Sequence, residues 1–125
     1  MTQGAEGTRV LDIAKKAVEA GSFDLVHSFT RTLKQDILRL GGGVHAEYLE
    51  RMESTRSTIG KWFSRINPKE KKILNLERQS FQPEATRVIQ AVSNQVRDEV
   101  IRHYAIDPKR IIVMHNTVDV ARFTP

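Results

Sequence analysis

The pattern of hydrophobic and polar positions predicts a chain that alternates between helices and short strands. Residues 8–20 place apolar side chains at i, i+4, i+7 and i+8, the spacing of one amphipathic helix. Residues 44–52 have helical character as well. Residues 53–67 look polar and irregular apart from Trp62, Phe63 and Ile66.

Two further helices begin at recognisable capping signals. Asn67-Pro68 supplies a cap and a proline at the first helical position, and this helix ends before Pro83. Ser93 caps the second helix, which is followed by a turn at Asp107-Pro108. Because this capping role already explains Ser93, the residue alone does not indicate catalysis.

Four short apolar runs of strand length lie among these helices: residues 23–29, 36–40, 87–92 and 110–114. Continuous apolar strands that are separated by helices indicate a parallel sheet covered on both faces. We therefore predict an α/β fold with a Rossmann-like parallel sheet and flanking helices.

Composition narrows the class of protein. The 125 residues make one domain or part of one. The chain has no cysteine, and its four histidines lack the short spacing of metal ligands, so we expect no disulfide and no metal site. It shows neither a secretory signal nor an apolar run of about 18 residues. These features predict a cytoplasmic protein, or one bound peripherally at the inner face of the membrane.

Residues 51–78 account for the net charge of +5, because they hold eight basic and three acidic residues. Such a segment suits a polyanion or an anionic membrane surface, and it equally suits a solvated helix face. Within it, Lys61, Trp62, Phe63 and Arg65 combine aromatic and basic groups as membrane-surface contacts do. The alternative is that the two aromatic residues pack against another domain. No nucleic-acid-binding motif is present, so nucleic acid is not favoured as a partner.

Candidate ligand-binding residues follow the predicted strands, because open parallel sheets bind ligands beyond the carboxyl ends of their strands. His27 and Arg39 lie near the ends of the first two strands, and Asn116 follows the last. Gly41, Gly42 and Gly43 could bring backbone N–H groups close to an anion, or could simply form a flexible turn.

The remaining histidines have both functional and ordinary interpretations. His45 could contact a sugar hydroxyl or act as a general base, but from the residues alone an exposed loop histidine is favoured. His103 lies among charged residues of the helix that Ser93 caps, and we expect it to be solvated.

The last 40 residues resemble family 4 glycosyltransferases at the end of the N-terminal domain of the GT-B fold. The family has a strand that ends in Ser, a helix that ends in Tyr, a strand, and then Asn-Gly-Val-Asp and Phe-x-Pro. The matching positions here are Ser93, Tyr104, Asn116, Val118, Asp119, Phe123 and Pro125. Thr117 replaces the usual glycine.

The resemblance extends upstream to about residue 20. Asp24-Leu25-Val26-His27 is similar to a family strand, and residues 36–49 with 77–81 resemble a lipopolysaccharide-core branch of the family. The resemblance implies metal-independent, retaining transfer from a nucleotide-sugar to a sugar or lipid-linked acceptor. His27, Arg39, Gly41–Gly43 and His45 would belong to the acceptor-side cleft, and Ser93, Asn116 and Asp119 to the interdomain edge.

The resemblance also implies that residues 1–125 are one partial, acceptor-side domain of an incomplete GT-B N-terminal half. The first strand and the donor-binding domain would lie outside it, so we expect the chain to bind no cofactor and to be inactive alone. Two other hypotheses stay open. One is a stand-alone module that binds polyanions or a membrane surface through residues 51–78, and the other is a remnant that pairs with a separately encoded partner.

Overall fold

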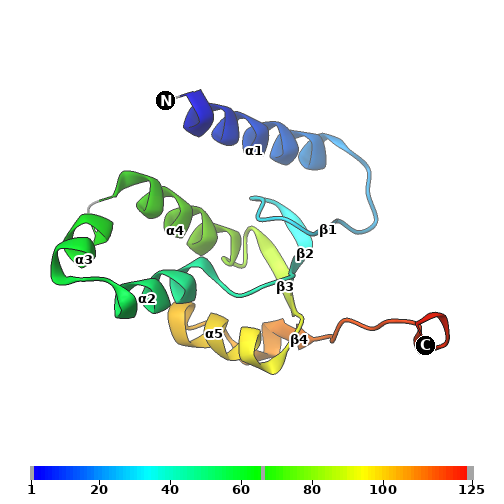
Figure 1. Ribbon diagram of the computed structural model, residues 1–125. Helices are drawn as coiled ribbons and strands as arrows, with labels where there is room; N and C mark the ends of the chain where they lie inside the picture. The colour runs from blue at the N-terminus through cyan, green and yellow to red at the C-terminus, as the bar shows by residue number, and fades with distance from the viewer. Residues whose placement is uncertain (1, 66, 124–125) are drawn as a thin grey trace.

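A computed structural model describes the backbone of residues 2–65 and 67–123, and the side chains of residues 9–60, 62 and 67–123. Five α-helices, four strands and two 3-10 helices follow one another along this part of the chain (Figure 1). In chain order they are α1 (Thr2–Ala20), β1 (His27–Ser28), β2 (Gln35–Leu40), α2 (His45–Thr55), α3 (Thr58–Arg65), α4 (Pro68–Ser80), β3 (Thr86–Ala91), α5 (Asn94–Tyr104), η1 (Pro108–Arg110), β4 (Ile111–Val113) and η2 (Val120–Arg122).

The four strands form one parallel sheet in the order β1-β2-β3-β4. In register, Ile37 lies between His27 and Val88, and Ile89 lies opposite Ile111. Right-handed crossovers between strands that follow each other in this way bring their helices to the same face of the sheet. The predicted α/β fold with a parallel sheet and flanking helices is confirmed. The expectation that helices cover both faces was wrong, because the helices that follow β2 and β3 pack on one face.

The hydrophobic core lies between this face of the sheet and the helices that follow β2 and β3. Side chains alternate along a strand, so Leu38 and Leu40 face the core while Arg39 faces the other way. The buried cluster contains Leu38, Leu40, Val44, Phe81, Ile89, Ala91, Val96, Val100, Ile106 and Ile111. Full burial of each large member contributes roughly 1.5–3 kcal/mol. The opposite face carries Arg39, Gln90 and the half-exposed Ile112.

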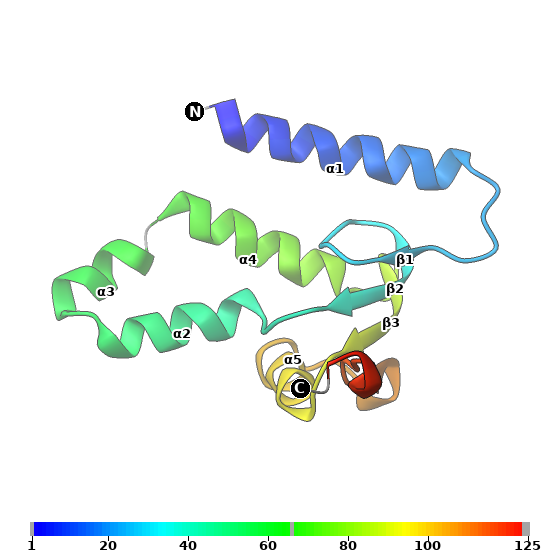
Figure 2. The ribbon, with the colours of Figure 1, turned by 45° about the vertical axis from the view of Figure 1, so that its right-hand side comes forward.

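Helices α2 and α4 lie side by side and are joined at their outer ends by α3 (Figures 1 and 2).

Both predicted caps are confirmed, since the Asn67 side chain accepts from the Lys69 N–H and the Ser93 hydroxyl accepts from the Val96 N–H. Helix α1 stands apart from α2 and α5 in both views (Figures 1 and 2). None of the helices in the described part of the chain is long and apolar enough to span a bilayer.

Two local predictions were wrong. Residues 53–67 are helical over most of their length, because Ile59, Trp62 and Phe63 repeat at i, i+3 and i+4 and make α3 amphipathic. The strand predicted over 23–29 narrows to His27–Ser28. Before it, the Asp36 carboxylate accepts from the Val26 N–H at 2.8 Å, and Phe23 and Leu25 stay exposed, so no packing extends the strand.

Ala105 ends α5 in the left-handed conformation, with φ 51° and ψ 40°. A residue with a Cβ atom is strained there by about 1 kcal/mol, and glycine is not. We therefore expect Ala105→Gly to raise the free energy of unfolding by about 0.5–1 kcal/mol in urea denaturation. Asn75→Gly, an exposed position inside α4, is the matched control and should lower it by a few tenths of a kcal/mol. A loss of stability in Ala105→Gly would contradict the assigned left-handed cap.

Candidate functional site

A fully buried carboxylate, Glu77 of α4, organises the carboxyl end of the sheet. One of its oxygens accepts from the His45 N–H at 2.8 Å, and the other accepts from the Ala46 N–H at 3.3 Å. These are the first two residues of α2, whose N-cap residue, Val44, makes no side-chain cap. Glu77 therefore supplies from a neighbouring helix the anion that the positive end of the α2 dipole favours.

The same carboxylate has two side-chain partners. Arg31, from the loop after β1, donates its Nη2 to Glu77 at 2.8 Å, and the Tyr104 hydroxyl of α5 donates to the other oxygen. Burial and the neighbouring Glu77 carboxylate raise the pKa of the Tyr104 phenol far above its usual value. Four donors from three segments thus compensate the desolvation of one buried charge.

The glycine loop does not present free N–H groups of the helix start to a ligand. Glu99 of α5 accepts from the Val44 N–H at 3.4 Å, and Glu77 takes the next two N–H groups. A Cβ atom on Gly43 would lie 2.7 Å from a Glu99 carboxylate oxygen, so a larger residue there would displace the end of this side chain. Gly41 and Gly42 are exposed. Two protein carboxylates therefore occupy the N–H groups that an anion would use.

His45 is not the exposed loop histidine that the residues alone favoured. It is the first residue of α2 and is largely buried, with its Nε2 2.6 Å from a carboxylate oxygen of Glu70. Its ring also stacks on Tyr48, with 5.6 Å between the ring centroids. The imidazole is thus held in one orientation between α2 and α4.

Three predicted site residues from separate segments lie close together. Arg39 of β2 donates to the side-chain oxygen of Asn116, which follows β4. The Arg39 guanidinium also lies 5.5 Å from the ring centroid of Phe29, and the Phe29 ring stacks on His27 at 4.7 Å. The structure therefore brings together His27, Arg39 and Asn116.

The other two residues of the predicted interdomain edge hydrogen-bond to backbone N–H groups two or three residues further along the chain. Ser93 caps α5, and Asp119 accepts from the Ala121 N–H at the start of η2. Of the predicted membrane or polyanion contacts, Trp62 is 61% exposed on α3. The side chains of Lys61, Phe63 and Arg65 lie outside the described residues.

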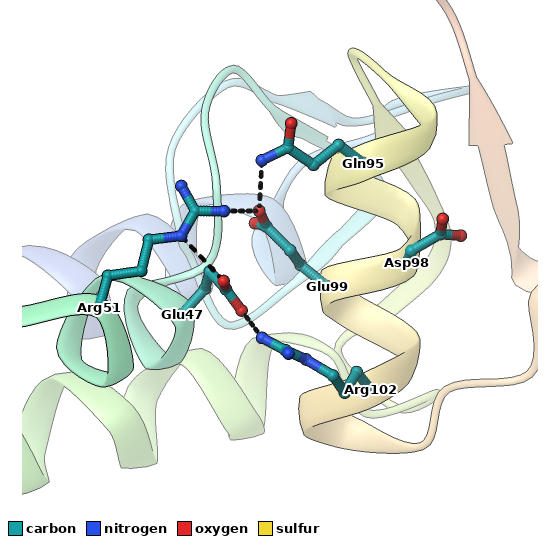
Figure 3. Close-up of a pocket in the computed structure, with 6 residues that line it drawn as sticks. All are labelled: Glu47, Arg51, Gln95, Asp98, Glu99 and Arg102. Atoms are coloured by element: carbon teal, nitrogen blue, oxygen red, sulfur yellow. Dashed lines mark hydrogen bonds and ion pairs between the residues drawn. The ribbon is translucent and has the colours of Figure 1, made fainter. Parts of the chain in front are cut away.

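An open pocket of about 510 Å³ lies between α2 and α5 and is lined by charged groups (Figure 3). Arg51 reaches across it and donates to both Glu47 and Glu99, while the Asp98 carboxylate points away from this group (Figure 3). Arg102 donates to Glu47 from the opposite side. The lining residues mainly pair with one another, so this network joins the two helices.

The prediction that His103 is solvated was wrong. Its side chain is 17% exposed, and Nε2 lies 2.9 Å from Glu47 and 3.4 Å from Glu50. The three side chains carry ligand types that suit a divalent cation. However, the Arg102 guanidinium donates to both carboxylates, and a cation would have to displace it.

The fold and this edge define an α/β protein with polar groups gathered at the carboxyl ends of parallel strands, where ligands bind in such sheets. The chain matches the family described as Glycosyltransferase Family 4 over residues 7–122. It therefore belongs to that family. Comparisons with curated proteins and with solved structures gave no match.

Sequence reasoning missed Glu77, Arg31, Tyr104 and Phe29 as parts of this site. One signal was present for Glu77, because it lies at i+4 between Ile73 and Phe81 on the apolar stripe of α4. A carboxylate at such a position indicates a buried charge with partners. No local sequence pattern could predict the ion pair of Arg31, because its partner, Glu77, lies 46 positions away.

Tyr104 makes stability depend on pH in a predictable direction. A tyrosine whose pKa is raised by folding stays protonated in the folded chain above pH 10, where the unfolded chain loses the proton, so its contribution falls as pH rises. We expect wild type to be more stable than Tyr104→Phe at pH 8, and the difference to shrink above about pH 10. Urea denaturation at both pH values measures this. Tyr48→Phe, which alters an exposed ring, is the control and should show a smaller change. A constant difference for Tyr104→Phe would contradict a pKa of Tyr104 that burial and Glu77 raise.

Proposed function

We propose that the chain is the acceptor-side part of a retaining glycosyltransferase, which transfers a sugar from a nucleotide-sugar to a glycan or lipid-linked acceptor. The observation that carries this proposal is the family match over residues 7–122, which covers nearly all of the chain. The resemblance of residues 36–49 and 77–81 extends the proposal to an acceptor of the lipopolysaccharide-core type.

The arrangement at the carboxyl edge supports an acceptor-binding role. His27, Arg39 and Asn116 offer imidazole, guanidinium and amide groups that hydrogen-bond hydroxyls. His45 lies at the same end of the sheet and is oriented by Glu70. Such groups can bind and orient a polyhydroxylated acceptor.

The same contacts support the proposal that the chain does not turn over alone. Transfer requires cationic groups or helix dipoles that stabilise the departing nucleotide diphosphate. At this edge Arg31 is paired with Glu77, and the N–H groups at the start of α2 are taken by Glu77 and Glu99. Arg39 contacts Asn116 and the Phe29 ring. In this proposal the stabilising groups come from a donor-binding domain that would act together with this chain.

We expect the isolated 125 residues to transfer no sugar from UDP- or GDP-sugars to lipid-linked or core-oligosaccharide acceptors. A chimera that continues residues 1–125 into the donor-binding domain of an active family member should transfer the sugar. Proton NMR of the anomeric signal should show retained configuration in the product. Robust transfer by the isolated chain would contradict the proposed division of labour, and an inverted product would contradict the retaining mechanism.

A second candidate function, binding to an anionic membrane surface, rests on α3. Ile59 and Trp62 are 71% and 61% exposed on this helix, and the neighbouring start of α4 exposes Lys69, Lys71 and Lys72. Exposed apolar groups next to lysines suit the interface of an anionic bilayer. Among residues 51–78, Glu77 is buried and paired with Arg31 inside the fold, so its charge does not oppose the exposed lysines at the surface.

Trp62 is the single tryptophan, so its fluorescence reports on α3 directly. Vesicles that contain phosphatidylglycerol should shift its emission to shorter wavelength, whereas phosphatidylcholine vesicles should not. Because the attraction is partly electrostatic, about 0.5 M salt should weaken the shift. Lys71→Glu/Lys72→Glu should weaken it as well, with Lys109→Glu, a distant exposed lysine, as the control. Equal shifts with both lipids would exclude the anionic surface as the ligand.

A further inference from the structure

Four side chains form a continuous contact on the sheet face opposite the core, and we call His27, Phe29, Arg39 and Asn116 the edge platform. The His27 and Phe29 rings stack at 4.7 Å with an angle of 26° between their planes. The Arg39 guanidinium carbon lies 5.5 Å from the Phe29 ring centroid, within the range of a cation–π contact. Arg39 also donates to the Asn116 side chain.

The edge platform joins three segments of the chain at the end of the sheet where ligands bind. His27 is in β1, Arg39 is one residue before the end of β2, and Asn116 is three residues beyond β4. Phe29 follows β1 directly, next to the pair Ser28–Leu38, so its ring contacts His27 two residues back along the chain and Arg39 on the neighbouring strand. Polar groups therefore flank the Phe29 ring in two directions.

Packing does not account for Phe29. Its side chain is 64% exposed, although a phenylalanine in a core or an interface buries most of its surface. A single exposed aromatic residue is ordinary on a protein surface. Phe29 differs because an imidazole and a guanidinium hold its ring, and because it lies at the ligand-binding end of the sheet.

The free hydrogen-bonding capacity of the edge platform consists mainly of donors. The guanidinium of Arg39 has five N–H groups, and it engages the amide oxygen of Asn116, which leaves the Asn116 amide N–H groups to donate outward. A ligand that fits needs one apolar face for the aromatic ring and several acceptor oxygens around its rim. A pyranose ring has both, since its C–H groups form an apolar face and its hydroxyls surround it.

We propose that the edge platform binds one pyranose ring of the acceptor. The sugar packs its C–H groups against the exposed part of the Phe29 ring, and Arg39, Asn116 and His27 hydrogen-bond its hydroxyls. This inference rests on the proposed function, which places the acceptor on this chain, and it adds the chemical class of the bound group and the residues that select it. A nucleobase could also stack on an aromatic ring. Its polar atoms lie on part of its edge, whereas the hydroxyls of a pyranose surround the whole ring and can reach polar groups that flank Phe29 from two directions.

Amide chemical shifts of the ¹⁵N-labelled full chain test this inference. The probes are methyl α-D-glucopyranoside and methyl α-D-mannopyranoside, with uridine as the nucleobase. We expect saturable shifts with at least one pyranoside in residues 27–30, 39–41 and 114–117. Phe29→Ala should weaken this binding by about tenfold, while Phe29→Tyr should retain it.

The chain provides a matched control in Phe23, which is 63% exposed in the segment before β1. Phe23→Ala should bind the pyranoside as wild type does. Arg39→Lys keeps the positive charge but lacks the planar fork that meets Asn116, and it should weaken binding by about threefold or more. Because Phe29 is exposed, Phe29→Ala should keep the dispersed spectrum of the folded chain.

Three results would overturn the inference: no saturable shift with either pyranoside, equal binding by Phe29→Ala and wild type, or shifts at these residues with uridine alone. Sugar transfer by the chimera is measured separately. Transfer without pyranoside binding at the edge platform would reject only this inference. Pyranoside binding there without transfer would count against the proposed function and leave the edge platform standing.

Discussion

The structure depends on one buried carboxylate. Glu77 lies on the core side of α4, where a charge without partners would be costly, and it is retained because donors from α2, α5 and the loop after β1 converge on it. It therefore determines where α2 begins, and it orients Arg31 and Tyr104. The apolar contacts among Phe81, Leu38 and Ile89 supply more stabilising surface, but they do not specify this relative placement of the elements.

This constraint also shapes the functional surface. Because Glu77 and Glu99 take the N–H groups at the start of α2, that helix end offers a ligand no ready anion site. The polar groups that stay available lie on the opposite side of the sheet, where Arg39 connects Phe29 with Asn116. The chain thus offers hydrogen-bonding and aromatic groups at its carboxyl edge, on which the proposed acceptor role rests. In the proposed division of labour the phosphate is handled by another domain.

The sequence predicted the parts of the fold that depend on local pattern. The parallel strands, the caps at Asn67 and Ser93 and the α/β class follow from apolar runs and from capping chemistry, and the structure confirms them. Helix α3 was not predicted, because its short apolar period of Ile59, Trp62 and Phe63 lies among polar residues. Burial of His45 and His103 could not be predicted, since Glu70 and Glu47 lie 25 and 56 positions away from them. The parallel topology was enough to predict that the candidate residues lie at the strand ends. The contact between Phe29 and Arg39 depends on the register of β1 and β2, which cannot be predicted from a local sequence pattern.

The most direct test of the central claim compares Glu77→Gln with Glu70→Gln by urea denaturation. Both changes neutralise a glutamate of α4, but Glu70 is partly exposed and pairs with His45, whereas Glu77 is fully buried and has four donors. If Glu77 organises the fold, Glu77→Gln should lower the free energy of unfolding by roughly 3 kcal/mol, and Glu70→Gln by less than about 1 kcal/mol. The His45 and Ala46 amides should also lose protection from hydrogen exchange in Glu77→Gln alone. Equal, small losses in the two variants, with both amides still protected, would contradict the account.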